Sequence, residues 1–145
     1  MYKRQGRLHT AIAALGQPDH PQLRADHQEL VGLLALAEHN WDAAIEAFDG
    51  AAKLRREALD YRAMVRVLAL AGKASEEAGR EKEASIRYLR AGRSAVLQGL
   101  FNDALKWLKR AEQIADTAGE AQIAREARVY LGQIEALTAA SSGKN

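Results

Sequence analysis

Two histidines are the first candidates for chemistry, because each follows an aspartate and they stand seven positions apart. His20 follows Asp19, and His27 follows Asp26. That spacing places both rings on one face if a single helix spans them. Pro21 instead marks a helix start directly after His20, and no third strong metal ligand stands nearby. We therefore expect solvated histidines and no bound metal.

Nucleophilic catalysis and phosphate binding both lack the residues they need. The sequence has no Gly-x-Ser-x-Gly motif, and Ser75, Ser85 and Ser94 fall within predicted helices without an evident histidine partner. Gly72-Lys73 lacks the upstream glycines of a phosphate loop. With no cysteine, a thiol nucleophile, a disulfide and a thiolate metal site are excluded as well. We expect no enzyme activity and no cofactor.

The composition describes one helical domain with mild charge. The chain has 145 residues, of which 48% are hydrophobic and 6% aromatic, and it has only two prolines. Lys and Arg number 21 against 19 Asp and Glu, too even a balance to indicate nucleic-acid binding. No apolar run reaches the ~20 residues of a membrane-spanning helix. These features leave the compartment open between cytoplasm and periplasm.

Apolar and small residues at helical spacing predict six main helices. Asp19 or His20 before Pro21, then Asn40 and Asp60, are the candidate N-caps. The predicted ranges are 21–38, 41–57, 60–78, 80–97, 100–117 and 120–138, with a short helix over 7–15. Residues 1–20 are thus expected to be an N-terminal remnant with a short helix, and residues 139–145 a disordered tail.

The helices carry a repeated pattern with a period of about 40 residues over the range 22–138. Small residues recur midway along the first helix of each unit, and alanines recur in the second. The matching residues are Gly32, Gly72 and Gly132 with Leu131, then Ala44, Ala84 and Ala104, then Trp41 and Phe101, and finally Ala51, Ala91 and Ala111. This pattern resembles the tetratricopeptide repeat (TPR) in a long form. The resemblance implies a helical scaffold that binds proteins.

The sequence also departs from that family. The closing proline is absent, and Ala35 and Ser75 replace the first-helix tyrosine. Ala104 follows Ala84 at only half the period, and the helix over 80–97 carries both a second-helix alanine and a first-helix glycine, Gly92. We therefore expect the repeat to slip near residues 80–105. The predicted fold is all-α: an antiparallel helix-hairpin solenoid, TPR-like, with six main helices and a short N-terminal helix.

By this resemblance we expect a peptide, a disordered segment or a partner subunit to bind in a concave groove lined by the first helices. The expected contacts are Asp26, Glu29, Arg66, Lys73, Glu76 and Arg93, with Trp107 as a further hot-spot candidate. Arg87, Arg90 and Arg93 could form a basic stripe for an acidic partner, but we favour a solvated face. The alternatives are a structural subunit of a larger assembly and, more weakly, an enzyme with an atypical site.

Overall fold

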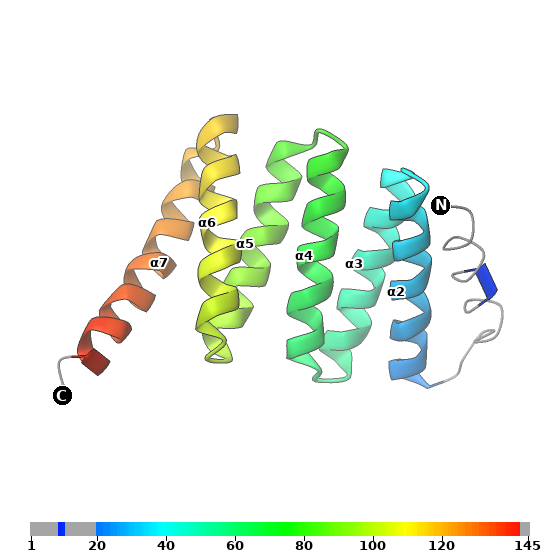
Figure 1. The fold of residues 1–145 in the computed structure, drawn as a ribbon, viewed down its shortest axis with the longest axis horizontal. Coiled ribbons are helices and arrows are strands. Elements are labelled where there is room, and N and C mark those ends of the chain that lie inside the picture. Colours follow the sequence, from blue (N-terminus) through cyan, green and yellow to red (C-terminus); the bar gives the residue numbers. More distant parts are fainter. Residues whose placement is uncertain (1–8, 11–19, 143–145) are drawn as a thin grey trace.

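The fold comes from a computed structural model, whose described residues are 9–10 and 20–142. These residues form six helices joined by short loops, with no strand (Figure 1). The helices are α2 (Pro21–Ala37), α3 (Trp41–Glu57), α4 (Tyr61–Glu77), α5 (Glu81–Leu97), α6 (Phe101–Ala118) and α7 (Ala121–Ser142). The all-α prediction is confirmed. The short helix expected over residues 7–15 and most of the 1–20 segment lie outside the described residues.

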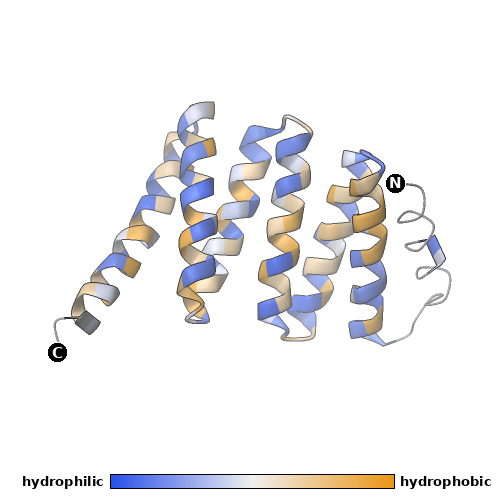
Figure 2. Ribbon diagram, in the orientation of Figure 1, coloured by the Kyte–Doolittle hydropathy of each residue, from blue (hydrophilic) through white to orange (hydrophobic). Residues whose placement is uncertain are grey.

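The helices stand in a row in sequence order, and each runs antiparallel to the one before it. Figure 1 shows two layers, with α2, α4 and α6 in front and α3, α5 and α7 behind. Along each helix, hydrophilic and hydrophobic residues alternate, as Figure 2 shows. Each helix therefore buries one side against its neighbours and leaves another side to solvent.

The same turn joins successive helices at a constant interval along the chain. In each turn one residue after the helix end has a positive φ, between 59° and 76°. The residues in this left-handed conformation are His39, Leu59, Gly79, Gly99 and Gly119. The N–H of the next residue then bonds a carbonyl five positions earlier, as when Asp60 donates to Arg55 at 2.8 Å. This is the Schellman arrangement, and it satisfies carbonyls that the helix end leaves free.

The slip expected near residues 80–105 is wrong, because the repeating unit at this level is one helix. In three helices a large side chain packs on a glycine 16 positions earlier: Phe48 of α3 on Gly32, Tyr88 of α5 on Gly72 and Leu108 of α6 on Gly92. Helix α5 therefore carries both the second-helix alanine pattern and the first-helix glycine. Its Tyr88 packs on Gly72 of α4, and Leu108 of α6 packs on its Gly92. The starts of α4, α5 and α6 keep the same spacing through this region.

The helix ends follow local chemistry. The predicted N-caps are confirmed: His20 Nδ1 accepts from the Gln22 N–H at 3.2 Å, and the side chains of Asn40 and Asp60 each accept an N–H three positions later. The last helix runs to Ser142, so the disordered tail predicted from residue 139 is wrong for residues 139–142. Alanine is the best helix former, and no glycine interrupts the end of this helix before residue 143. Residues 143–145 lie outside the described part.

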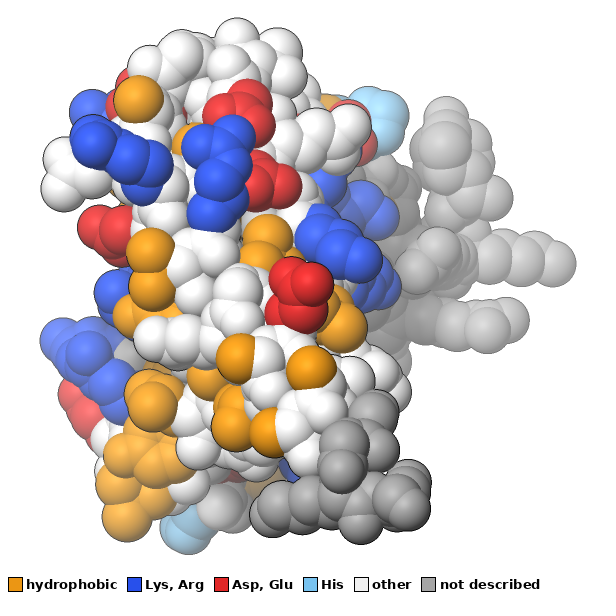
Figure 3. Space-filling model, turned by 90° about the vertical axis from the view of Figure 1, so that its left-hand side faces the viewer, with side chains coloured by type: hydrophobic (Ala, Val, Ile, Leu, Met, Phe, Trp, Pro, Cys, Tyr) orange, Lys and Arg blue, Asp and Glu red, His pale blue; other side chains and the backbone are white. Residues whose placement is uncertain are grey.

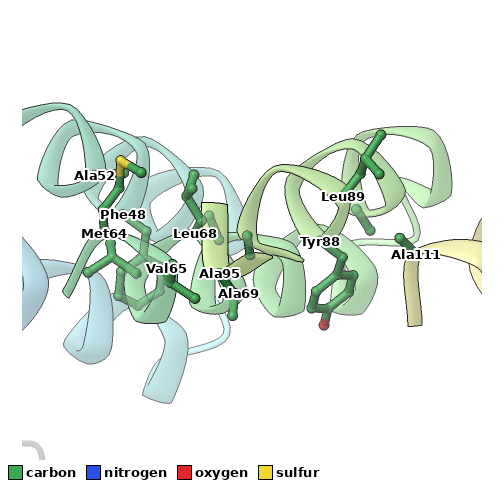
Figure 4. Packing of buried hydrophobic residues seen from close by; sticks show 14 of the residues in the cluster. Phe48, Ala52, Met64, Val65, Leu68, Ala69, Tyr88, Leu89, Ala95 and Ala111 are labelled. Atoms are coloured by element: carbon green, nitrogen blue, oxygen red, sulfur yellow. The ribbon is translucent and has the colours of Figure 1, made fainter. Parts of the chain in front are cut away.

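The core consists of alanines with a few large side chains between them. Phe48, Leu68, Leu108 and Ile134 are fully buried. In Figure 4 the side chains of Phe48, Met64 and Leu68 gather between α3 and α4. Small residues let the helix backbones approach, and the few large ones fill the space that remains. The result is a row of closely packed helices.

Two glycine substitutions test this packing. A Cβ on Gly92 would lie 2.6 Å from Leu108 Cγ and 3.2 Å from the Leu108 backbone nitrogen, whereas a Cβ on Gly132 meets no described atom within 4 Å. We expect Gly92→Ala to lower the free energy of unfolding by about 1–3 kcal/mol through overpacking. Gly132→Ala should raise it by about 0.5–1 kcal/mol through helix propensity. Urea titrations of both variants check this, and equal effects would contradict the packing scheme.

Candidate functional site

Arg55 on α3 is the most buried charged side chain described, with 6% of its surface exposed. It donates to Glu29 Oε1 through Nε at 3.2 Å and through Nη2 at 2.9 Å, and it also bonds Asp26. Asp60 Oδ2 lies 3.8 Å from its Nη1. Burial lowers the pKa of the guanidinium, but the bonds to Asp26 and Glu29 outweigh that effect and hold the pKa above its ordinary value.

Glu29 also receives a second arginine, from the next helix of its layer. Arg66 Nη2 on α4 lies 2.7 Å and 2.9 Å from the two carboxylate oxygens of Glu29. The carboxylate thus joins α2, α3 and α4, and a partner would have to displace an arginine to reach it. Asp26 and Glu29, which the sequence predicted as contact residues, both bond Arg55 within the fold, and their role in binding a partner stays a prediction.

A second cluster surrounds Glu76, another predicted contact residue. Its Oε1 accepts from the Tyr88 hydroxyl at 3.0 Å and from Arg110 Nε at 3.3 Å, so it joins α4, α5 and α6. Trp107 stacks on Tyr88, with ring centroids 5.4 Å apart and planes at 9°, and Lys106 Nζ lies 4.6 Å from the Trp107 ring. Glu76 is therefore engaged within the fold. Trp107 is partly buried, and its role as a hot spot stays a prediction.

The structure does not bring the predicted contact residues into one groove. Arg66 and Glu76 pair with α2 and α6, the neighbours of α4 in its own layer. Lys73, also on α4, is exposed. Arg93 instead lines hollows that α5 forms with α3 and α4 on one side and with α7 on the other. The set therefore divides between the two layers.

One groove of the described structure is one that the sequence did not single out. It has a volume of about 530 Å³ and lies where the end of α3, the start of α4 and the end of α5 meet. Its lining residues are Arg56, Tyr61, Met64, Leu68, Arg90, Arg93, Ser94, Leu97 and Gln98. We call it the α3–α5 groove. Met64 and Leu68 are buried at its base, whereas Leu97 is 85% exposed.

The charges of this groove are unbalanced. Arg87, one member of the predicted basic stripe, pairs with Asp49 at 2.6 Å and so belongs to the fold. Arg90 and Arg93, the other two, form no ion pair with any described residue, and neither does Arg56. The stripe was visible in the sequence, but only the positions of the carboxylates separate its paired member from its unpaired ones.

A second hollow opens at the α7 end of the row. It has a volume of about 630 Å³ and is lined by Leu105, Lys109, Glu112, Leu131, Ile134, Glu135, Thr138 and Ala139. Val129 and Leu137 on α7 are 58% and 54% exposed. Figure 3 shows this end of the molecule, where apolar side chains lie in the open between charged ones. Gly132, which continues the spacing of Gly32, Gly72 and Gly92, has no side chain seated on it among the described residues.

Other kinds of site leave no trace in the part of the chain that the structure describes. No group of three or more acidic or histidine side chains there is placed to hold a metal ion. None of the described helices is long and apolar enough to cross a membrane.

Comparison of the chain with protein-family models gives no match, and comparison with curated proteins gives none either.

The two arginines that share Glu29 provide a matched pair of substitutions. We expect Arg55→Ala to lower the free energy of unfolding by about 3 kcal/mol, because it leaves carboxylates without their buried partner. Arg66 is 57% exposed at its side chain, so Arg66→Ala should cost less than about 1 kcal/mol. Chemical denaturation of both variants measures the difference, and similar losses would contradict the structural role of Arg55.

Tyr88 predicts a pH dependence of stability. Burial, with a smaller contribution from the charge of Glu77, raises the pKa of Tyr88 from 10.0 to about 12. Because the folded pKa is the higher one, its contribution to stability is complete below about pH 10 and is lost as the pH rises through about 12. Wild type should therefore lose more stability than Tyr88→Phe between about pH 9 and about pH 11.5 in urea titrations. Parallel losses in the two proteins would show that Tyr88 ionises as freely in the folded state.

Proposed function

We propose that the chain is a TPR-like solenoid of helix hairpins that works as a protein-interaction scaffold. Helices that start at a constant interval, joined by one kind of turn, support this reading, because two successive helices match the hairpin unit of the long repeat form. The pattern of a small residue under a large one supports it further, since it repeats between successive helices. Arrays of this kind expose long surfaces to partners.

The observation that carries the proposal is the α3–α5 groove. Leu97 stands almost fully exposed at its rim, and Tyr61 is exposed beside it. Large apolar side chains exposed beside a hollow are typical of sites that bind another protein. We therefore place the binding site in this groove, and not on the first-helix face that carries Arg66 and Lys73.

The groove is suited to binding and not to chemistry. Its volume of about 530 Å³ accommodates the side chains of a short segment. Among the described lining residues there is no carboxylate or histidine to act as a base, and the Ser94 hydroxyl already accepts from Gln98 Nε2 at 3.0 Å. Enzyme activity, the weakest of the alternatives, gains no support from this arrangement.

A specific observation favours the second candidate, a structural subunit of a larger assembly. The α7 end has an empty place above Gly132, an adjoining hollow, and exposed Val129 and Leu137. At the corresponding position of α5, by contrast, the Leu108 side chain of α6 packs against Gly92. A helix of another molecule that presented one large side chain would complete the end in the same way.

Peptide selection tests the scaffold function. We would select peptides from a displayed random library against the full chain and measure their affinities by fluorescence anisotropy. Leu97→Ser should weaken the selected peptides about tenfold, because it removes an apolar contact from the groove. Leu137→Ser, an equally drastic change at the exposed α7 end, is the matched control and should have no effect. Peptides that bind both variants equally would overturn the groove assignment.

The subunit alternative has its own measurement. If the α7 end is normally covered, the isolated chain should self-associate as its concentration rises, and Val129→Glu should reduce that association by placing a charge on the apolar surface. Light scattering coupled to size-exclusion chromatography measures both. A monodisperse monomer at high concentration would count against this alternative.

A further inference from the structure

We infer that the α3–α5 groove takes an acidic protein segment that carries one large apolar side chain. The inference rests on the proposed scaffold function and gives the chemistry of the partner. It draws on three features of the groove: its unpaired arginines, its apolar residues, and the line of Arg90, Arg93 and Leu97 along α5.

The arginines of the groove differ from the other described arginines because they combine two features: they form no ion pair with a described carboxylate, and they line the same groove. Several arginines of the described chain are paired with carboxylates: Arg55, Arg66, Arg80, Arg87, Arg110 and Arg128. Arg56, Arg90 and Arg93 have no such pair with a described residue, although they come from two helices and line the same groove. The remaining unpaired arginines of the described chain line none of the hollows above: Arg24, Arg62 and Arg125. A guanidinium presents a fork of N–H donors that matches a carboxylate, so the three side chains of the groove form a receptor for acidic groups.

Acidic side chains near the groove leave this positive charge uncompensated. The described lining of the groove itself has none. Glu120 and Glu126 of α7 line the hollow on the other side of Arg90 and Arg93, and neither comes within ion-pairing distance of them. Arg90 and Arg93 thus stand between the α3–α5 groove, whose described lining has no carboxylate, and a hollow toward α7 that Lys82 lines together with Glu120 and Glu126. An acidic segment is attracted more strongly to the α3–α5 groove, where no carboxylate of the described lining offsets the arginines.

The apolar part of the groove sets the second requirement. Met64 and Leu68 form a base that is buried under the rim, and Leu97 and Tyr61 stand at the edge. A leucine, phenylalanine or tryptophan of the partner would pack against exposed Leu97 and Tyr61 and remove their apolar surface from water. An acidic segment without such a residue would contact the arginines alone, where solvent and salt weaken the attraction.

The line of residues along α5 fixes the pattern of the segment. Arg90, Arg93 and Leu97 are spaced by three and four positions, so they lie on one side of the helix. Two turns of helix extend about 10 Å. The partner should therefore place an acidic residue and its apolar residue within about 10 Å, which is about three residues of extended chain.

Charge reversals test the inference on the peptides selected in the previous section. Arg90→Glu with Arg93→Glu should weaken them at least about tenfold, and raising the salt concentration should weaken wild-type binding. Arg24→Glu with Arg125→Glu is the matched control: it changes the net charge equally, and both side chains are exposed outside the described hollows. Circular dichroism verifies that both double variants are folded. We also expect the selected peptides to be rich in Asp and Glu next to a large apolar residue.

The outcomes separate this inference from the proposed function. Peptides that depend on Leu97 but are neutral or basic would overturn the acidic partner and leave the scaffold function standing. Peptides that ignore Leu97 would overturn both the acidic partner and the assignment of the binding site to this groove. A single-stranded DNA oligonucleotide that binds with the same dependence on Arg90 and Arg93 as the peptides would show a general anion site and overturn the assignment to an acidic protein segment. Binding that is lost equally in both double variants would show that net charge, and not this groove, attracts the peptides.

Discussion

Close approach of neighbouring helices is the constraint on which the structure depends. Leu108 can pack on α5 only because Gly92 has no side chain, and the same holds for Tyr88 on Gly72 and Phe48 on Gly32. The large residue follows its glycine by 16 positions. The lengths of the helices and of the turn between them must therefore preserve this interval. The turns with a positive φ recur at the interval of the helices and maintain that spacing, even where His39 and Leu59 adopt a conformation that glycine adopts at lower cost.

Ion pairs then fasten helices that are not adjacent in sequence. Arg66 reaches Glu29 from α4 to α2, Arg110 reaches Glu76 from α6 to α4, and Arg87 reaches Asp49 from α5 to α3. Each pair links neighbouring helices of the same layer, whereas the small-residue contacts join successive helices of different layers. Most exposed pairs of this kind contribute little stability each, and the buried Arg55 cluster contributes most.

This network also bears on the proposed binding site. In the layer of α2, α4 and α6, the carboxylates of Glu29 and Glu76 already form ion pairs with arginines of the same molecule. Arginines in the α3–α5 groove lack such partners, and an apolar surface lies beside them. The proposed site is therefore the place where the internal pairing of charges is incomplete. A site held by packed helices and not by loops lowers the entropic cost of binding where it is preformed.

Helix positions, N-caps at His20, Asn40 and Asp60, and the repeating small residues could all be predicted from the sequence, because they depend on contacts within about four residues. Which layer a side chain joins could not, because it depends on packing between helices. Arg87 and Arg90 look alike in sequence, yet Asp49, 38 positions before Arg87, pairs with only one of them. The sequence by itself thus determined the helices and their spacing. Only the tertiary structure decided which charges are neutralised within the fold and which remain for a partner, because ion pairing depends on distances between helices that no local pattern encodes.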